Sequence, residues 1–522
     1  MSNFSGRDIL AAFVVAFLLV LPDWVFACIS QSFKAPCDIK VLLLVLPLSA
    51  GFIMSRYRIA SYICLVILWI MQLMQFSNLA YFGHLLSPYS LYLFSSEISD
   101  VLQEASNVFV RYLYIIPIVT IPFFAIAYLT KRSKTRCWIG SVMLVCSFCA
   151  FGYKYYDSIR PRFNPNGIRF TIDNSLKAFW GYLTIKYKRY PVKNYKPYEV
   201  VSIDGFKLTE PVTVVYIIGE STNFRHMSLF GYERKTTPLL EELSKDNGFY
   251  YTHGIAGAIS TIASCKFMMN VLREADNAIQ ASKDTTNLFK LAKSRGFKTF
   301  YLSMQTEHML SSIAGVNYID VVRTKDSNII KVNELMDEYL FDLINQQEFG
   351  EFNFIILHQR CIHTPYTNAS KRNHKKFKKF DGSKEPVIDD YDNAMVYNDM
   401  IISALFNRFN GQKNGKFYVI WASDHNELMG EDGLFGHGHG CLHFRTAEIP
   451  IMVQSNDAEF IEKIKMINRP THYEIARCIA SLFGYNVRNP NEEENVFFIS
   501  GVDFNGRCGF LRYEKDSDSR NG

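Results

Sequence analysis

The sequence predicts an α/β protein with two main parts: an N-terminal transmembrane domain of five helices, and a larger domain whose mainly parallel sheet is covered by helices. Apolar runs dominate the first 153 of its 522 residues, whereas the rest has an ordinary soluble composition. From about Val200 onward, short apolar runs alternate with stretches of helical spacing, which is typical of a parallel sheet. The net charge of +6 is small for this length, so nucleic-acid binding has no compositional support.

Five segments are apolar enough to span a membrane. They are about Ile9–Phe26, Val41–Met54, Ala60–Phe82, Tyr112–Leu129 and Trp138–Tyr153. The first segment resembles a signal peptide, but it lacks a basic region beyond Arg7 and has no A-x-A cleavage signal. We therefore expect it to be an uncleaved anchor.

The charges of the loops predict the orientation of these segments. Arg56 and Arg58 separate the second and third segments, and four basic residues lie in 131–136, between the fourth and fifth. The loop 84–107 carries acidic residues and no Lys or Arg. Because basic loops stay in the cytoplasm, everything after Tyr153 is expected outside.

The exported parts contain cysteines and a basic linker. Cys28 and Cys37 share the first exported loop, where oxidation can join them, although a free pair is an equal alternative. Five more cysteines follow in the exported domain, an odd number that leaves at least one unpaired within it. Residues 154–199 are basic and aromatic, and Ser175–Lys188 is expected to form an amphipathic helix on the bilayer surface. A solvated linker is the alternative.

Three apolar runs end in side chains that bind metals. Val214–Ile218 is followed by Gly219 and Glu220, Phe354–Leu357 by His358 and then His363, and Phe417–Ala422 by Ser423, Asp424 and His425. Ligands bind at the carboxyl ends of strands in open α/β sheets, and a charge there is costly unless it is paired. Each run alone is better explained by a helix cap or a loop carboxylate, but the three together predict one metal site.

Further elements of the second domain follow from the same patterns. Lys298–Leu302 and Ile449–Val453 are expected as strands, and Val332–Gln346, Asp392–Arg408 and Tyr473–Leu482 as helices. The polar stretch from Glu514 to the end is expected to be disordered.

An ordered set of short motifs runs through nearly the whole chain. It comprises Gly219-Glu220-Ser221, Gly231-Tyr232-Glu233-Arg234, Thr236-Thr237-Pro238, Thr261–Ser264, Tyr301-Leu302-Ser303, Gln305, His363-Thr364-Pro365, Tyr391-Asp392-Asn393, Ser423-Asp424-His425, Glu427, Gly430-Glu431, Gly436-His437-Gly438 and Thr471-His472-Tyr473. In these motifs the sequence resembles the phosphoethanolamine transferases of bacterial envelopes, metal-dependent members of the alkaline phosphatase and sulfatase superfamily. The resemblance implies a transmembrane domain at 1–153, an interfacial linker at 154–199, a periplasmic sulfatase-like α/β/α sandwich at 200–513 and a disordered tail at 514–522.

The resemblance also implies a threonine nucleophile, and the matching position is Thr261 in Gly257–Ser264. A neutral hydroxyl is a weak nucleophile that metal coordination activates, and a helix N-terminus adds positive potential for a phosphate. On the local sequence alone, a helix cap at Ser260-Thr261 is the better reading. Ser260 is the competing hydroxyl.

By the same resemblance, Glu220, Asp424 and His425 join Thr261 around a Zn²⁺ ion, a plausible four-ligand set. His363 and His437 would flank the phosphate, where they stabilise charge or hold a second, weaker metal. His358 is an outer candidate, and His439 and His443 are expected to be surface residues.

The sequence departs from the family pattern at several positions. No cysteine precedes Thr261 nearby, Cys265-Lys266 stands where a hydrophobic residue and Pro are common, and Met304 stands where Asn is frequent. These differences leave the metal set intact and the acceptor open.

The activity implied is transfer of phosphoethanolamine from phosphatidylethanolamine to an envelope acceptor, either lipopolysaccharide (lipid A or core) or a periplasmic glucan, through a covalent threonine intermediate. The protein would lie in the bacterial inner membrane with its catalytic domain in the periplasm. A phosphoglycerol transferase of the lipoteichoic acid synthase type is one alternative. A non-catalytic ectodomain is another, but no expected ligand or nucleophile is missing from the sequence.

Overall fold

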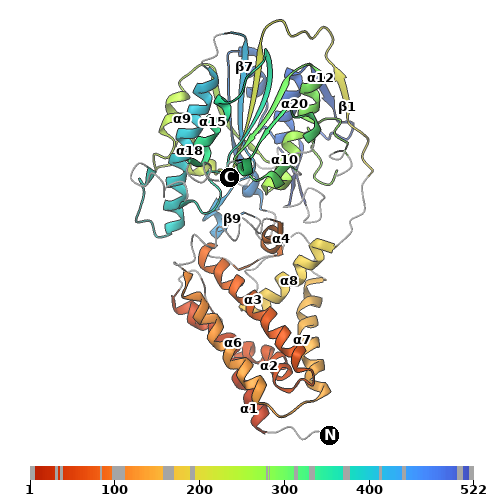
Figure 1. Cartoon of the computed structure of the whole chain (residues 1–522), viewed down its shortest axis with the longest axis vertical. Coiled ribbons are helices and arrows are strands. Elements are labelled where there is room, and N and C mark those ends of the chain that lie inside the picture. Colours follow the sequence, from red (N-terminus) through yellow and green to blue (C-terminus); the bar gives the residue numbers. More distant parts are fainter. Residues whose placement is uncertain are drawn as a thin grey trace. The chain divides into compact units, whose positions relative to one another are not determined.

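The computed structural model divides into two compact units (Figure 1). The first comprises Met1–Arg189 with Gly430–Cys441, and the second comprises Tyr190–Met429 with Leu442–Gly522. The structure describes residues 6–29, 33, 35, 39–82, 85–86, 88–96, 112–156, 170–187, 194–277, 280, 283–310, 315–327, 335–367, 377–410, 414–437, 443–501 and 510–515. Cys37 and His439 are outside these ranges, so the predicted Cys28–Cys37 pair stays a prediction.

The first unit is built from apolar helices. They are α1 (Gly6–Ile29), α2 (Ile39–Met54), α3 (Arg58–Phe82), α4 (Pro88–Ser96), α6 (Ile115–Arg132), α7 (Trp138–Tyr156) and α8 (Thr171–Tyr187), and the segment from Gly430 adds the short strand β9 (Phe435–Gly436). Among the described residues, three helical stretches are long and apolar enough to cross a membrane: Gly6–Ile29, Arg58–Ala80 and Ile115–Arg132. The second and fifth predicted spans form shorter apolar helices, Lys40–Met54 and Trp138–Cys149. Three of the five predicted spans are therefore long and apolar enough by this measure, and the other two are apolar helices that are shorter.

Small residues let α2 and α7 approach closely. A Cβ atom at Gly51 would lie 2.8 Å from the Cα of Leu144, and one at Gly140 would lie 2.4 Å from the carbonyl carbon of Met54. Such small-residue contacts are a common way for apolar helices to pack, since their backbones can then touch. Helices α1, α3 and α6 leave large apolar side chains exposed, as a lipid-facing surface requires; examples are Leu10, Ile59 and Phe124.

Helix α8 is fixed by a carboxylate from α1. Asp23 is fully buried and accepts hydrogen bonds from the backbone N–H and the hydroxyl of Thr171, each at 2.9 Å. The next turn is tied to α3, because Asn174 Nδ2 donates to Gln75 Oε1 at 2.7 Å and Gln72 Nε2 donates to the hydroxyl of Ser175 at 2.9 Å. The helix predicted from Ser175 thus begins four residues earlier, with its first turn inside the helical unit. Its location at a bilayer surface stays a prediction.

The second unit contains a seven-stranded sheet in the order β3-β10-β7-β2-β6-β4-β5. The strands are β2 (Val212–Gly219), β3 (Phe249–Ile255), β4 (Lys298–Ser303), β5 (Val321–Arg323), β6 (Phe352–His358), β7 (Lys416–Ser423) and β10 (Glu448–Ser455). Strands β7, β2, β6, β4 and β5 are parallel, whereas β10 pairs antiparallel with β7 and β3. The remaining strands of this unit are β1 (Glu199–Ser202), β8 (Leu428–Met429), β11 (Tyr485–Arg488), β12 (Val496–Ser500) and β13 (Phe510–Glu514).

Helices cover both faces of this sheet (Figure 1). Helices α9 (Pro238–Leu243), α15 (Tyr339–Asn345) and α18 (Pro386–Asn410) lie on one side, and α10 (Thr261–Met269), α12 (Leu288–Ser294) and α20 (His472–Leu482) on the other. Helix α19 (Ala458–Lys465) follows β10. Side chains along β2 point alternately to the two faces of the sheet. Val215 and Ile217 pack in the core under α18, and Tyr216 and Ile218 point to the other face. The predicted mainly parallel, helix-covered sheet is confirmed.

Two expectations need correction, and one strand of the sheet was missed. β3 was not predicted, and the predicted strand Ile449–Val453 lies within β10, which is antiparallel to its neighbours. In the predicted helix Val332–Gln346, the described part has a 3₁₀ turn at Met336–Glu338 and then α15. Glu514, which was expected to begin a disordered tail, is the last residue of β13.

We expect Gly219→Ala to destabilise the second unit. A Cβ atom there would lie 2.1 Å from the ring of Trp421, which is fully buried and cannot swing aside. Overpacking of this kind costs about 1–3 kcal/mol, and the strain would fall on the residue beside Glu220. Thermal unfolding should show a lower midpoint than for Gly350→Ala, where the nearest atom is 3.9 Å away. Equal midpoints for the two variants would contradict this packing.

Candidate active site

The three predicted strand ends lie side by side. Since the sheet order is β7-β2-β6, Glu220 follows the central strand, and Asp424 and His425 follow its neighbour. The backbone N–H of Asp424 donates to the carbonyl of Gly219 at 2.9 Å, which continues the parallel pairing to the edge. Glu220 is 2% exposed, and neither Asp424 nor His425 is exposed at all, so these ionisable groups lie out of contact with water.

Thr261 completes a compact group of four side chains. It is the first residue of α10, and its hydroxyl oxygen lies 3.4 Å from Glu220 Oε1 and 3.4 Å from His425 Nε2. His425 Nε2 is in turn 3.7 Å from Glu220 Oε1 and 3.4 Å from Asp424 Oδ2. Thr261 is the most exposed of the four, at 8%.

These separations fit a shared metal ion. Zinc binds oxygen and nitrogen ligands at about 2.0–2.1 Å, so tetrahedral ligand atoms are about 3.3–3.4 Å apart. The separations above are 3.4–3.7 Å, longer than good hydrogen bonds between the same atoms. Asp424 Oδ2 is buried with no hydrogen-bond partner among the described residues, which is costly unless a cation binds it. Glu220, Asp424 and His425 also offer ligand atoms within 4.8 Å of one another.

Local hydrogen bonds orient the candidate ligands His425 and Asp424 toward the other clustered side chains. His425 Nδ1 lies 3.2 Å from the carbonyl oxygen of Asn426, which favours the proton on Nδ1 and leaves Nε2 as an acceptor. Asp424 Oδ1 accepts the backbone N–H of Ser221 at 3.0 Å and of His425 at 2.8 Å, so Oδ2 is the oxygen left for the site. Burial raises the pKa of Asp424, and the hydrogen bonds from the backbone N–H groups of Ser221 and His425 oppose that rise.

Gln305, a motif residue with no predicted role, contacts a candidate ligand. Gln305 Nε2 donates to Glu220 Oε2 at 2.7 Å, and Arg360 Nη1 donates to Gln305 Oε1 at 2.7 Å. Ser221, whose φ of 48° is in the left-handed region, donates its hydroxyl to Glu220 Oε1 at 2.7 Å. Both carboxylate oxygens are therefore oriented. Gln305 follows β4 at the same edge of the sheet, and this position after a strand is the sequence feature that could have predicted its contact with the site.

Two of the other predicted histidines, His358 and His363, have different contacts. His358 ends β6 and is buried, with Nδ1 2.9 Å from the Tyr301 hydroxyl, and burial lowers its pKa to about 4. His363 is in the turn after β6, with Nδ1 2.7 Å from the carbonyl oxygen of Thr364. His437 belongs to the segment Gly430–Cys441, which groups with the first unit. The proposed roles of His363 and His437 at a phosphate or a second metal stay predictions.

The motif Gly231-Tyr232-Glu233-Arg234, which follows β2, has a structural role. Tyr232 and Arg234 both bind Asp392 of α18, at 2.9 and 2.8 Å, and Arg234 also binds Asp389 at 2.8 Å. His226 Nδ1 lies 2.7 Å from the other oxygen of Asp392. These contacts hold the loop that begins with Glu220 on α18. They do not place Tyr232 or Arg234 among the candidate ligands.

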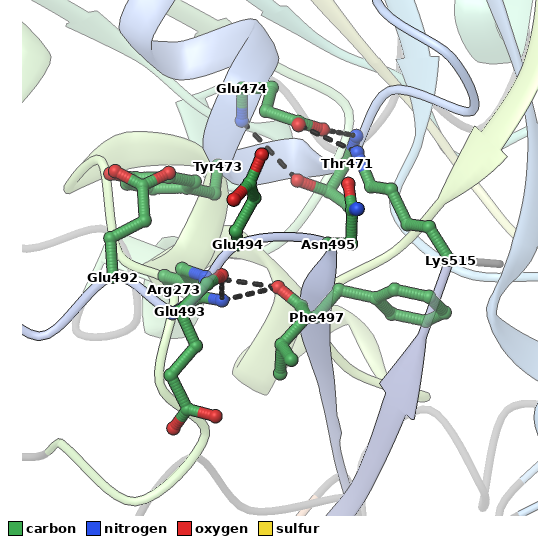
Figure 2. Close-up of a pocket in the computed structure, with 11 residues that line it drawn as sticks. Arg273, Thr471, Tyr473, Glu474, Glu492, Glu493, Glu494, Asn495, Phe497 and Lys515 are labelled. Atoms are coloured by element: carbon green, nitrogen blue, oxygen red, sulfur yellow. Dashed lines mark hydrogen bonds and ion pairs between the residues drawn. The ribbon is translucent and has the colours of Figure 1, made fainter.

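A cavity of about 310 Å³ lies elsewhere in the second unit (Figure 2). Its lining residues are Arg273, Thr471, Tyr473, Glu474, Glu492, Glu493, Glu494, Asn495, Val496, Phe497 and Lys515. Several of its acidic groups are paired, since Glu474 binds Lys515 at 2.7 Å and Glu492 binds Arg477 at 3.2 Å. None of the four clustered side chains lines this cavity.

Comparison with known proteins identifies the class. A family model described as Sulfatase matches residues 212–485, which include the whole seven-stranded sheet and the four clustered side chains. The chain belongs to the sulfatase family. Within it, the predicted resemblance to phosphoethanolamine transferases is confirmed by the relatives that it matches.

Two curated relatives and one solved structure illustrate this. Over 307 residues the chain is 28% identical to the Kdo(2)-lipid A phosphoethanolamine 7''-transferase of Salmonella typhimurium, covering 54% of this chain and 53% of that protein. Over 271 residues it is 28% identical to the phosphoethanolamine transferase EptA of Helicobacter pylori, covering 49% and 50%. The matches span about half the length of these relatives. The integral membrane lipooligosaccharide phosphoethanolamine transferase A of Neisseria meningitidis has the same fold, with a TM-score of 0.62, 19% identity, and coverage of 93% of this chain and 96% of that one.

Replacing a candidate ligand should remove zinc. We expect Asp424→Asn and His425→Ala to purify with little bound zinc, because each loses one of four ligand atoms from a buried site. Elemental analysis of the purified protein measures this directly. His443→Ala, the same type of change at a described histidine outside the group, should keep the wild-type zinc content. Full zinc in both ligand variants would refute the assignment.

Gln305→Glu should weaken zinc binding without removing a ligand. It replaces an N–H donor by a carboxylate against Glu220 Oε2, and loss of such supporting contacts typically costs 10–100-fold in metal affinity. Competition with a chelator measures the change. Gln346→Glu, at the exposed end of α15, makes the same chemical change and should leave the affinity unaltered.

Proposed function

We propose that this protein is a zinc-dependent phosphoethanolamine transferase of the bacterial inner membrane, with its catalytic unit in the periplasm. The observation that carries the proposal is the position of the Thr261 hydroxyl, 3.4 Å from both Glu220 and His425 at the first residue of α10. A hydroxyl among metal ligands is the arrangement expected of an activated nucleophile rather than of a helix cap. Two observations support Thr261 over Ser260: Ser260, the N-cap residue, makes no side-chain capping bond, and the Thr261 hydroxyl lies beside Glu220 and His425.

Thr261, Glu220, Asp424 and His425 would hold the zinc. When bound there, zinc would act as a Lewis acid that lowers the pKa of the Thr261 hydroxyl and offsets the charge of a phosphate. The carboxylates of Glu220 and Asp424 lie in a buried environment, where that compensation is strongest.

The reaction would be a double displacement. The Thr261 oxygen attacks the phosphorus of phosphatidylethanolamine, the bond from phosphorus to the diacylglycerol oxygen breaks, and that oxygen leaves with a proton as diacylglycerol. An acceptor hydroxyl then attacks the phosphorus of the threonine adduct, gives up its proton, and the Thr261 oxygen leaves. Backbone N–H groups at the start of α10 would offer hydrogen bonds to the phosphate. His363 and His437 are the proposed further groups that stabilise its charge.

The donor and the acceptor follow from the relatives and the anchor. The relatives are named as phosphoethanolamine transferases, and one is named for lipid A. Apolar helices in the first unit would keep the protein in the bilayer that contains the donor lipid. We therefore propose an envelope glycolipid or glycan as the acceptor.

Thr261→Ala should end transfer while the protein stays folded. Loss of a covalent nucleophile typically lowers the rate by about 10⁴-fold or more, and Thr261→Ser should retain part of the activity because a hydroxyl remains. Transfer from labelled phosphatidylethanolamine in vesicles measures the rate, and Ser260→Ala serves as the neighbouring control. Without acceptor, mass spectrometry of the wild type should find phosphoethanolamine on the peptide containing Thr261.

Other outcomes would each exclude part of the proposal. An adduct on Ser260, or near wild-type transfer by Thr261→Ala, would rule out the nucleophile. A phosphoglycerol adduct would identify the other donor class. No adduct from a zinc-loaded wild type would favour a non-catalytic role.

A further inference from the structure

One buried histidine forms hydrogen bonds both to the loop that leads to Thr261 and to the strand that leads to Asp424. His472 is the first residue of α20 and is fully buried. Its Nδ1 lies 3.1 Å from the backbone nitrogen of Gly257, in the loop that leads to Thr261. Its Nε2 lies 2.9 Å from the carbonyl oxygen of Ser423, the residue before Asp424. The imidazole therefore spans the nucleophile loop and the ligand strand.

These two partners fix the protonation of the ring. A backbone N–H can only donate, so Nδ1 must accept, and a carbonyl oxygen can only accept, so Nε2 must carry the proton. His472 is thus neutral and in a single tautomer. Burial also lowers its pKa to about 4, which keeps the ring neutral near pH 7.

The rest of the nucleophile loop is held by backbone contacts. The N–H of Ile255 donates to Pro470, and that of Ala256 donates to Ala447, at 3.0 and 2.7 Å. The carbonyl of Gly257 accepts from Ser500 at 2.8 Å. A Cβ atom at Gly257 would lie 2.5 Å from the Phe267 ring, so the loop is also packed tightly against α10. Within this set, His472 supplies the link to β7.

We propose that His472 is a positioning residue for the transfer reaction, which sets the distance between Thr261 and the Asp424-His425 pair. The proposal rests on the function proposed above. His472 has no recorded contact with the side chains of the four clustered residues, so its effect passes through the backbone at Gly257 and Ser423. If either bond is lost, the loop and the strand can shift relative to each other, and misplacement by about 1 Å can cost about 10²-fold in rate.

Two conservative variants separate the two bonds. In His472→Gln the side-chain nitrogen can reach the place of Nε2, which keeps the bond to Ser423 and loses the acceptor for Gly257. In His472→Asn the side-chain oxygen takes the place of Nδ1, which keeps the bond to Gly257 and loses the donor to Ser423. The full-length protein, zinc-loaded and in vesicles containing phosphatidylethanolamine, should form the threonine adduct about 10²-fold more slowly with either variant. KM for the lipid and zinc content should stay at wild-type values.

Ile475→Ala is the matched control for a purely structural effect. Ile475 is fully buried on the same helix, and its truncation should lower the unfolding midpoint while the rate of adduct formation is kept. Two outcomes would refute the positioning role. In the first, the His472 variants slow the reaction only as much as their loss of thermal stability explains, judged against Ile475→Ala. In the second, the His472 variants lose zinc.

The wild type in the same assay separates the two proposals. A wild type that forms no adduct would refute the proposed function itself. A wild type that reacts, together with His472 variants that react equally fast, would refute the positioning role alone. If His472→Gln is slow and His472→Asn is not, the bond to Gly257 matters for the rate and the bond to Ser423 does not, so the role of the Ser423 bond is refuted.

Discussion

The second unit is organised around the cost of placing two carboxylates and an imidazole together where water cannot reach them. Glu220, Asp424 and His425 are at most 2% exposed. Removing a carboxylate from water costs several kcal/mol, and two facing each other also repel. A shared divalent cation removes both penalties at once. Glu220 accepts hydrogen bonds from Ser221 and Gln305, and Asp424 accepts them from two backbone amides. These bonds hold the two carboxylates in the orientation that such a cation requires.

Sheet topology makes such a group possible from distant parts of the chain. Thr261 is 41 residues from Glu220 and 164 residues from His425, yet all three share one edge of the sheet. The parallel order β7-β2-β6 brings the strand ends to the same side, and α10 approaches them from one face. Each ligand therefore sits on a rigid element rather than on a free loop, which suits a site whose distances must be kept.

The sequence predicted which side chains meet at this edge of the sheet because these side chains follow strongly apolar strands. Val214–Ile218 and Phe417–Ala422 are uniform β-branched or aromatic runs, and the residue after such a run has a defined place in a parallel sheet. β3 was missed because its polar Thr252 and His253 interrupt the pattern, and its antiparallel partner is about 200 positions away in sequence. The contacts of Gln305 and His472 depend on loops that meet only in the folded chain, so no local pattern showed them.

The bond from Asp23 to Thr171 has a practical consequence for where the catalytic part can be separated. Helix α8 lies after the last predicted span, but its carboxylate cap and its amide partners come from α1 and α3. A shortened protein that started at Lys154 would keep α8 and lose these partners. Phe170, Ile172 and Leu176, all at most 2% exposed in the whole chain, would then face water, and aggregation would follow. A secreted catalytic fragment should instead start near Tyr190, where the second unit begins.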